Sequence, residues 1–257
     1  MNIHPSSVVH EKAILGKDVK IGPFCVVGEN VTLGDGTELI SHVSIVGHTT
    51  IGKRNVFSPF CSIGQLPQDL KYRGEETFVK IGDDNVFKEY VTVNLGTIAN
   101  KVTEIGNKNF IMVSTHIAHD CVVGNNCILA NSTMLAGHVI VDDYATIGGN
   151  TAVQQFVRVG SYSYIGGCSA VDRNVPPYCA GYGNRLNIKG INKIGLMRRG
   201  FSEEQIHEIH DAWRIFYKST LTKEQAIVEL EKVAIGKPHV EDFLNFLKAD
   251  LKGAIAR

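Results

Sequence analysis

The sequence has no excess of charge of either sign, no closely paired cysteines and no long hydrophobic run. Lysine plus arginine number 26 among the 257 residues, and aspartate plus glutamate also number 26, so no overall field attracts a nucleic acid or a membrane surface. None of the six cysteines forms a CxxC pair, which argues against a zinc ribbon or a redox motif. The longest apolar runs fall far short of the roughly 20 residues of a membrane-spanning helix. We therefore expect no nucleic-acid partner and no insertion into a membrane.

The first residues of the chain also lack a targeting signal. Residues 1–15 contain no basic stretch followed by an apolar core, so we expect no signal peptide. We expect a soluble cytoplasmic protein whose thiols stay reduced. The length allows one large domain, or one large domain with a small one attached.

An apolar residue at every sixth position is the strongest pattern present. It holds without exception from Ile3 to Ile63, resumes at Ile81 and runs unbroken from Ile105 to Val171. Helices require apolar spacings of three and four, and ordinary strands a spacing of two. A period of six instead fits a triangular coil, in which each hexapeptide forms one short side and buries its apolar residue. Three such sides make a coil of 18 residues, so the sequence predicts a β-solenoid in which residues 18 apart stack.

Small residues follow the apolar ones at fixed distances. Glycine commonly comes next, as at Gly22, where we expect it to ease the corner of the coil. Four positions after the apolar residue the side chain is usually small. This slot holds four of the six cysteines, namely Cys25, Cys61, Cys121 and Cys127. We interpret these cysteines as packed core residues rather than as catalytic thiols.

Two segments interrupt the repeat without shifting its frame, at residues 66–80 and 94–104. Polar residues replace the expected apolar ones there, for example at Asp69 and Glu75. Insertions in a solenoid become loops on one face, which is often the binding face. We therefore expect both segments to be surface loops beside a site.

Beyond residue 184 the pattern changes twice. Residues 185–200 hold Arg185, Lys189, Lys193, Arg198 and Arg199 but no acidic residue. Such a run is either a solvated face or a docking surface for an anion, which would be a phosphate or an acidic carrier protein.

From residue 201 the apolar spacing becomes helical. Ser202 with Gln205 and Thr222 with Gln225 are typical of capping boxes, and each precedes an apolar stripe. A third stripe consists of Phe243, Phe246, Leu247 and Leu251. The sequence thus predicts a β-solenoid over residues 1–184, a basic connection over 185–200 and a small helical domain over 201–257.

Residues 112–139 concentrate the candidate chemistry in His116, His119, Asp120 and His138. One coil of 18 residues places Gly137 on His119, and His138 on Asp120. Acyl transfer to a hydroxyl requires a general base, a group that orients this base and a backbone N–H that stabilises the oxyanion. We assign these catalytic roles to His119, Asp120 and Gly137. A single histidine would be read as an ordinary surface or core residue, but the stacked cluster favours catalysis without a protein nucleophile.

Several longer motifs extend this interpretation to a family. The runs HIAHDC, LAGHV, QDLKY, GGCSAV, VPPY and GLMRRGF resemble the UDP-N-acetylglucosamine O-acyltransferase family of lipid A synthesis, and the similarity spans essentially the whole chain. The resemblance implies a mainly β protein: a left-handed parallel β-helix of hexapeptide repeats followed by a small C-terminal α-helical domain. Its handedness departs from the usual right-handed crossover.

The same resemblance implies the reaction and its partners. The enzyme would transfer a (3R)-3-hydroxyacyl chain from acyl carrier protein to the 3-position of a UDP-sugar, UDP-N-acetylglucosamine, without a covalent intermediate. It would need no cofactor and no metal, because the donor is carried on the phosphopantetheine of the carrier. It would form a homotrimer with active sites between subunits, in the cytoplasm of a Gram-negative type bacterium.

The resemblance also assigns residues beyond the catalytic ones. The histidine that matches His119 is the family's base, and those that match His116 and His138 contact substrate. The further substrate-binding residues that it implies are Gln68, Asp69, Lys71, Gln155, Asn192, Arg198 and Arg199. Among these, Gln155 matches a residue near the sugar, while Arg198 and Arg199 match positions that hold phosphates or the acidic carrier.

Acyl-chain length is assigned to Gly167, which matches the position where the family measures the chain. Independently, Gly149 and Gly167 are 18 residues apart and should stack into a strip without side chains. The strip predicts a longer rather than a shorter hydroxyacyl donor, and a bulky residue at position 167 would shorten it.

The chain departs from the commonest family pattern at four positions. Asn94, Gln154 and Arg185 stand where histidine is usual, and Ile194 stands where glutamate is usual. Some relatives acylate a 3-amino analogue of the sugar, and Asn94 with Ile194 is typical of them. An amide product is therefore the first alternative to the ester.

Two further alternatives belong to other classes. A γ-type carbonic anhydrase holds zinc with three histidines, for which His116, His119 and His138 are candidates. The basic run and the helical tail have no place in such a protein. A structural β-helix without activity would leave the histidine cluster unexplained.

Overall fold

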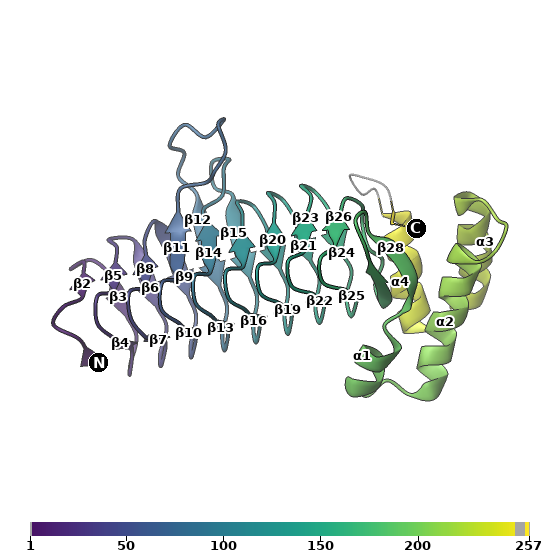
Figure 1. Ribbon diagram of the computed structural model, residues 1–257, viewed down its shortest axis with the longest axis horizontal. Coiled ribbons are helices and arrows are strands. Elements are labelled where there is room, and N and C mark those ends of the chain that lie inside the picture. Colours follow the sequence, from purple (N-terminus) through teal and green to yellow (C-terminus); the bar gives the residue numbers. More distant parts are fainter. Residues whose placement is uncertain (1, 250–254, 257) are drawn as a thin grey trace.

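The computed structural model describes residues 2–249 and 255–256. Figure 1 shows an elongated stack of short strands, with the N-terminal strands at one end and the C-terminal helices at the other. Three sheets form the sides of this stack, and successive strands along the chain join sheet A, sheet B and sheet C in turn. Within the described residues all strand pairs are parallel except β27 (Cys179–Tyr182) with β28 (Asn187–Ile191).

Each sheet collects every third strand of the coiled chain. Sheet A consists of β1 (Asn2–Ile3), β4 (Lys20–Ile21), β7 (Glu38–Leu39), β10 (Val56–Phe57), β13 (Val86–Phe87), β16 (Phe110–Ile111), β19 (Ile128–Leu129), β22 (Thr146–Ile147), β25 (Tyr164–Ile165), β27 (Cys179–Tyr182) and β28 (Asn187–Ile191). Sheet B consists of β2 (Val8–Val9), β5 (Val26–Val27), β8 (Ser44–Ile45), β11 (Ser62–Gln65), β14 (Thr92–Asn94), β17 (His116–Ile117), β20 (Met134–Leu135), β23 (Ala152–Val153) and β26 (Ala170–Val171). Sheet C consists of β3 (Ile14–Leu15), β6 (Val31–Leu33), β9 (His48–Ile51), β12 (Phe78–Ile81), β15 (Val102–Ile105), β18 (Val122–Val123), β21 (Ile140–Val141) and β24 (Arg158–Val159).

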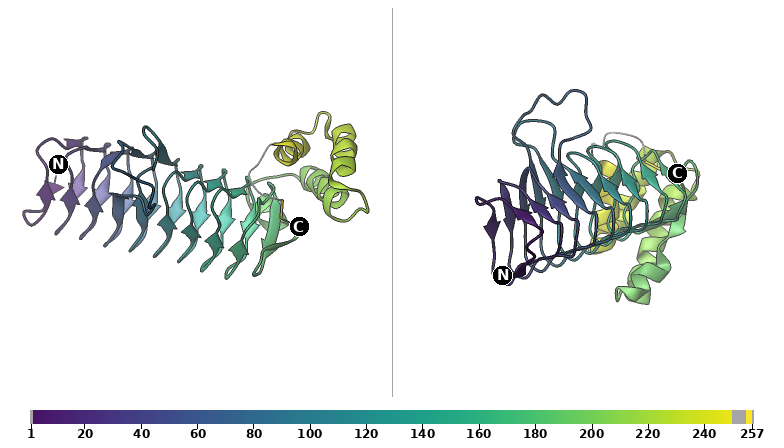
Figure 2. Two further views of the ribbon diagram at one scale, coloured as in Figure 1. Left: turned by 90° about the horizontal axis from the view of Figure 1, so that it is seen from above. Right: turned by 60° about the vertical axis from the view of Figure 1, so that its left-hand side comes forward.

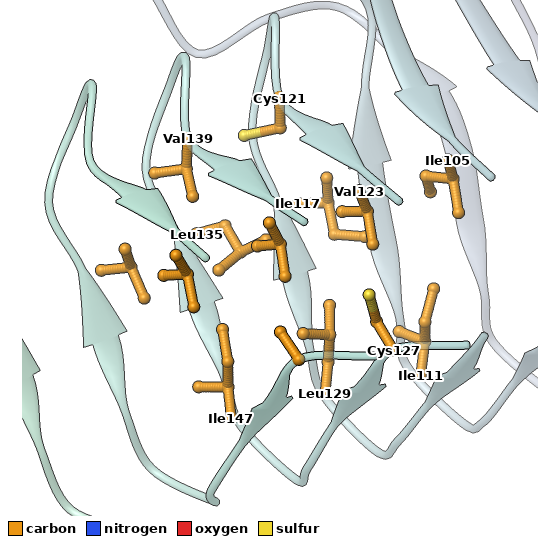
Figure 3. Packing of buried hydrophobic residues seen from close by; sticks show 14 of the residues in the cluster. Ile105, Ile111, Ile117, Cys121, Val123, Cys127, Leu129, Leu135, Val139 and Ile147 are labelled. Atoms are coloured by element: carbon orange, nitrogen blue, oxygen red, sulfur yellow. The ribbon is translucent and has the colours of Figure 1, made fainter. Parts of the chain in front are cut away.

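The strand register confirms the predicted coil. Ile111 pairs with Leu129 and Leu129 pairs with Ile147, so partners recur at the predicted distance along the chain. Their side chains point into the prism, where all three are fully buried (Figure 3). Burial of one apolar residue per side, repeated along the whole stack, supplies the hydrophobic core that a single coil could not form.

The four cysteines in the small-residue slot are also core residues, as predicted. Cys121 and Cys127 appear in Figure 3 among the buried aliphatic side chains. Burial, with a smaller contribution from the neighbouring Asp120 carboxylate, raises the pKa of the Cys121 thiol to about 12. A thiol in that state is a poor nucleophile, so the chemistry of the site does not involve it.

The corners give glycine a different role from the one predicted. The left-handed residues lie three positions after the apolar residue, and most of them carry side chains, as at Asp120 (φ 60°) and His138 (φ 63°). Asp, Asn and His are the non-glycine residues that tolerate this region best. Glycine directly after the apolar residue instead permits close stacking, since a Cβ on Gly22 would overlap the carbonyl oxygen of Ile40 in the next coil.

Both interruptions of the repeat leave the prism at one corner, between sheets B and C. The first connects β11 to β12 and the second connects β14 to β15. Figure 1 shows the first as a long loop above the prism, and Figure 2 shows both projecting from the same edge. The loops are shorter than the predicted segments, because residues 78–80 and 102–104 already belong to strands of sheet C.

The C-terminal part begins with short elements and continues as helices. Residues 185–200 include strand β28 and helix α1 (Lys193–Arg198), which precede α2 (Glu203–Tyr217), α3 (Lys223–Ala234) and α4 (Pro238–Lys248). Both predicted capping boxes are present, at Ser202 on α2 and at Thr222 on α3. The third predicted stripe lies on α4, where Phe243 and Leu247 are buried, while Leu251 lies outside the described residues. No helix in residues 2–249 is long and apolar enough to cross a bilayer.

Candidate active site

The corner between sheets B and C carries the predicted catalytic residues. His119 and Asp120 lie in the turn between β17 and β18, and Gly137 and His138 lie in the turn one coil further on. The backbone N–H of His138 donates to the carbonyl oxygen of His119 over 3.0 Å, which confirms the predicted stacking of these two turns. Because the loops emerge at this same corner, the site and the loops face one another.

His119 and Asp120 form a buried, hydrogen-bonded pair. The Nδ1 atom of His119 lies 2.9 Å from Oδ2 of Asp120, and both side chains are almost fully buried. Burial alone would raise the pKa of the Asp120 carboxyl, but hydrogen bonds from Thr97 and His119 outweigh it and hold this pKa below its usual value. An ionised carboxylate only accepts, so Nδ1 carries the proton and Nε2 of His119 presents a lone pair.

Two threonines that sequence reasoning missed hold Asp120 in place, Thr97 through the carboxylate and Thr103 through the backbone. Thr97 donates to Asp120 twice, from Oγ1 to Oδ2 over 2.6 Å and from its backbone N–H to Oδ1 over 3.2 Å. The backbone N–H of Asp120 donates to Oγ1 of Thr103 over 2.9 Å. Both threonines belong to the second interruption. The 18-residue spacing that placed Gly137 and His138 in the site does not apply within this insertion. A threonine in an insertion gives no signal of its own.

Gly137 lies directly against the base. A Cβ at this position would lie 2.5 Å from Nε2 of His119 and would overlap the ring. Its N–H makes no hydrogen bond to any other described residue, whereas the equivalent N–H of Asn125, at the corner between sheets C and A, donates to Asp143. Position 137 therefore combines an open amide with close access to the imidazole.

Two more histidines complete the cluster. Nε2 of His138 lies 3.6 Å from Oδ2 of Asp120, and its ring stacks on Phe156 at 4.7 Å. His116 lies on the outer face of sheet B, where Nδ1 is 2.7 Å from Oγ1 of Thr92. Burial, and to a smaller extent the nearby His119, lowers the pKa of His116, so this imidazole is neutral near pH 7.

The loops and His138 together enclose a cleft of about 420 Å³. Its walls include Asp69 and Lys71 from the first loop and Thr97 from the second. The structure thus brings two of the three predicted loop residues to the catalytic corner. Gln68 is exposed and does not line this cleft, and Gln155 is exposed on the coil above Gly137.

Two of the four unusual positions, Asn94 and Arg185, have side-chain partners. Asn94 is buried and donates from Nδ2 to the carbonyl oxygen of Leu66 over 3.1 Å, while its Oδ1 has no partner among the described residues. Arg185 pairs with Asp172 over 3.1 Å, and Gln154 donates from its backbone to the carbonyl oxygen of Val171 and exposes its side chain. The fourth, Ile194, is exposed on α1.

The basic residues lie away from the histidine corner. Asn192 caps α1, accepting from the N–H of Gly195 at Oδ1 and donating from Nδ2 to the carbonyl oxygen of Tyr162. Arg198 and Arg199 are exposed at the end of α1, and the guanidinium of Arg199 lies 4.9 Å from the ring centroid of Tyr144. Tyr144 belongs to the corner between sheets C and A. Within one chain, the basic residues and the catalytic pair are therefore not brought together.

Gly149 and Gly167 stack at the third corner, between sheets A and B. A Cβ on Gly167 would lie 3.0 Å from the carbonyl oxygen of Gly149, and a Cβ on Gly149 would lie 3.1 Å from the carbonyl oxygen of Asn131. The described atoms nearest to either Cβ position all belong to the backbone. The predicted strip without side chains is therefore present, on the opposite edge of sheet B from His119.

The same cluster offers ligand atoms to a metal ion. One atom each from His119, Asp120 and His138 lies within 4.8 Å of the others. His116 is not part of this group in the described chain, so the three histidines of the carbonic anhydrase alternative do not converge. The hydrogen bonds from Thr97 and His119 to Asp120 suit an orienting carboxylate better than a metal ligand.

Sequence families match two parts of the chain. Residues 103–137 match the bacterial transferase hexapeptide family, and residues 174–255 match domain 2 of UDP-N-acetylglucosamine O-acyltransferase. The chain is 45% identical over 252 residues to the acyl-[acyl-carrier-protein]–UDP-N-acetylglucosamine O-acyltransferase of Thermodesulfovibrio yellowstonii, covering 98% of both proteins.

Solved structures agree with this relationship. LpxA from Acinetobacter baumannii is 40% identical, with a TM-score of 0.96 over 99% of both chains. UDP-N-acetylglucosamine O-acyltransferase (LpxA) from Moraxella catarrhalis is 39% identical, with a TM-score of 0.95 over 100% of both chains. These likenesses confirm the predicted left-handed parallel β-helix with C-terminal helices, and they favour neither the amide-forming alternative nor the carbonic anhydrase. The chain belongs to the family of acyl-[acyl-carrier-protein]–UDP-N-acetylglucosamine O-acyltransferases.

Proposed function

We propose that this chain transfers a (3R)-3-hydroxyacyl group from acyl carrier protein to the 3-hydroxyl of UDP-N-acetylglucosamine, the first step of lipid A biosynthesis. The observation that carries this proposal is the arrangement of His119, Asp120 and Gly137 in a member of this family. The base has a free Nε2, its other nitrogen is held by a carboxylate, and an open backbone N–H lies beside it. This is the set of groups that acyl transfer to a hydroxyl requires.

The reaction proceeds in two steps, addition of the hydroxyl to the thioester and loss of the thiolate. Nε2 of His119 takes the proton of the sugar hydroxyl as its oxygen bonds to the thioester carbonyl carbon, and the N–H of Gly137 stabilises the resulting oxyanion. The carbon–sulfur bond then breaks, and the imidazolium returns its proton to the thiolate of the phosphopantetheine. Asp120 stays ionised and stabilises the imidazolium, so no covalent intermediate on the protein is needed.

Substrate contacts surround this centre. We assign Asp69, Lys71 and Gln68 on the first loop to the nucleotide-sugar, together with His116, His138 and Gln155 on the prism. Asn192 contributes by fixing α1, and Arg198 and Arg199 contribute positive charge for phosphates and the acidic carrier.

A homotrimer explains why the base and the acyl-length residue lie at different corners of one chain. His119 lies at one edge of sheet B, and Gly167 lies at the other edge. A groove that starts at the base and ends at the acyl-length residue therefore needs two neighbouring prisms, one from each subunit. The proposed trimer supplies such a groove at each of its interfaces, in the cytoplasm where the carrier protein delivers the donor.

The test is a product assay with a fold control. His119→Ala should lower kcat by about 10²–10⁴, the usual contribution of a positioned base, while the melting temperature stays close to that of the parent protein. Mass spectrometry should find an ester of UDP-N-acetylglucosamine as the product. Retention of full activity in His119→Ala contradicts the assignment of the base, and an amide product from the 3-amino sugar alone contradicts the acceptor.

Metal analysis tests the chemistry independently. We propose that no bound metal takes part, so prolonged chelation should leave kcat unchanged. Stoichiometric zinc in the purified protein, lost together with activity on chelation and restored with it, would replace this mechanism by a metal-based one.

A further inference from the structure

A column of aromatic rings runs along the corner between sheets C and A and ends under the basic residues. Tyr144 stacks on Tyr162 at 4.7 Å, and Tyr162 stacks on Tyr178 at 5.8 Å. The column is anchored at its C-terminal end, where the hydroxyl of Tyr178 donates to Asp242 on α4 over 2.8 Å. Phe201, between α1 and α2, packs edge-on against Tyr162. The ring of Tyr144 is therefore fixed by both the β-helix and the helical part.

Arg199 lies over the ring of Tyr144, with its guanidinium carbon 4.9 Å from the ring centroid. A guanidinium on an aromatic face is attracted by the ring and keeps its N–H groups in the plane of the guanidinium, directed away from the ring. Within the described residues Arg199 makes no ion pair and no side-chain hydrogen bond. All of its donors are thus available to an anion. Arg198 is also exposed, but no aromatic ring lies beneath its guanidinium in this part of the chain.

We infer that Tyr144 is a positioning residue that holds the Arg199 guanidinium ready for the phosphate or the acidic surface of the acyl carrier. The inference rests on the proposed function, in which Arg199 binds that partner. An arginine held on a ring loses less rotamer freedom on binding than a free one, so its contact with an anion is stronger. Tyr144 itself contacts neither the sugar nor the reacting atoms.

The experiment compares two donors and a set of variants. The donors are the acyl-carrier substrate and the same acyl group on a small pantetheine-free thioester. Tyr144→Leu removes the ring, and we expect KM for the acyl carrier to rise about two- to fivefold, the usual strength of an exposed cation–π contact. KM for the small thioester and kcat for both donors should stay unchanged. Tyr144→Phe keeps the ring and should behave like the parent protein.

Double mutants show whether Tyr144 acts through Arg199 or through a general effect on the structure. In an Arg199→Ala background, Tyr144→Leu should have no further effect on KM, whereas in an Arg198→Ala background its full effect should persist. Tyr90→Leu is a matched control, because Tyr90 also occupies a left-handed corner (φ 62° against 61° for Tyr144) and stacks on a ring, Phe60, at 5.0 Å. No cation lies over Tyr90 among the described residues, so KM for the carrier should not change.

Distinct outcomes contradict the inference and the function on which it rests. If Arg199→Ala raises KM for the carrier but Tyr144→Leu does not, the docking role stands and the positioning role is wrong. An equal effect of Tyr144→Leu with and without Arg199 also overturns positioning. If Arg199→Ala itself leaves KM unchanged, both the docking role and the inference are wrong. Should Tyr144→Leu fail to fold, Tyr144→Asn removes the ring with a residue that tolerates the left-handed corner, and KM for the carrier equal to that of the parent then refutes the inference.

Discussion

The ring of His119 occupies the space that a side chain at position 137 would need. A Cβ on residue 137 would overlap the imidazole, and it would lie 2.5 Å from the Nε2 atom that we assign as the base. Glycine at this position is therefore a requirement of the stacked coils, quite apart from its role as an oxyanion donor.

Gly137→Ala should lower kcat by at least about 100-fold, because displacement of a catalytic group by an ångström costs about that factor. Overpacking should also destabilise the fold by about 1–3 kcal/mol. Steady-state kinetics and a thermal melt measure the two effects. Gly190→Ala is the control, since a Cβ there meets no atom within 4 Å. A Gly137→Ala enzyme with the kcat of the parent would show that the amide and the ring are not arranged for catalysis.

Thr97→Val should lower kcat by roughly tenfold, because a charge-assisted hydrogen bond to a carboxylate contributes about 1.5–3 kcal/mol. Loss of this bond also lets the pKa of Asp120 rise, which weakens its hold on the tautomer of His119. Thr133→Val is a suitable control. Thr133 is also buried and donates to the carbonyl oxygen of Ala130, away from the catalytic corner. Equal kcat values for the two variants would contradict the role of Thr97.

His116 should make the stability of the protein depend on pH. Its pKa is lowered in the folded state, so the unfolded chain takes up a proton at this residue before the folded protein does. The stability that neutral His116 contributes is complete above the pKa of about 6.5 that histidine has in the unfolded chain. This stability is lost as the pH falls through the lower pKa of the folded protein. His116→Gln should flatten the decline of the melting temperature between about pH 7.5 and pH 5. A decline of the same slope in both proteins would refute the assignment of this group.

Gly167→Met should shift the donor preference to shorter acyl chains. The added side chain fills the strip that Gly167 forms with Gly149. Each methylene excluded from the groove costs about 0.8 kcal/mol, or roughly a factor of four in kcat/KM. Competition between long and short 3-hydroxyacyl donors, read by mass spectrometry, measures the shift. An unchanged preference would place the end of the groove elsewhere.

The coil and much of the catalytic centre could be predicted from the sequence without coordinates. The six-residue period places one apolar residue on each side of the coil, and burial of that residue recurs with this spacing. Because the coil length is constant between Ile105 and Val171, spacing along the chain converts directly into stacking. The positions of Gly137 on His119, and of His138 beside Asp120, follow from that stacking.

Features that depend on the insertions and on side-chain direction emerged only from the folded chain. Thr97 reaches Asp120 because the second loop folds back over the corner, and no period describes that path. Asp, His and aromatic residues occupy the left-handed corners, so glycine is not needed there. The glycines after the apolar residues instead allow successive coils to stack closely. The contact of Arg199 with Tyr144 joins residues far apart in sequence, and it depends on Asn192, which ties the start of α1 to Tyr162 in the same corner.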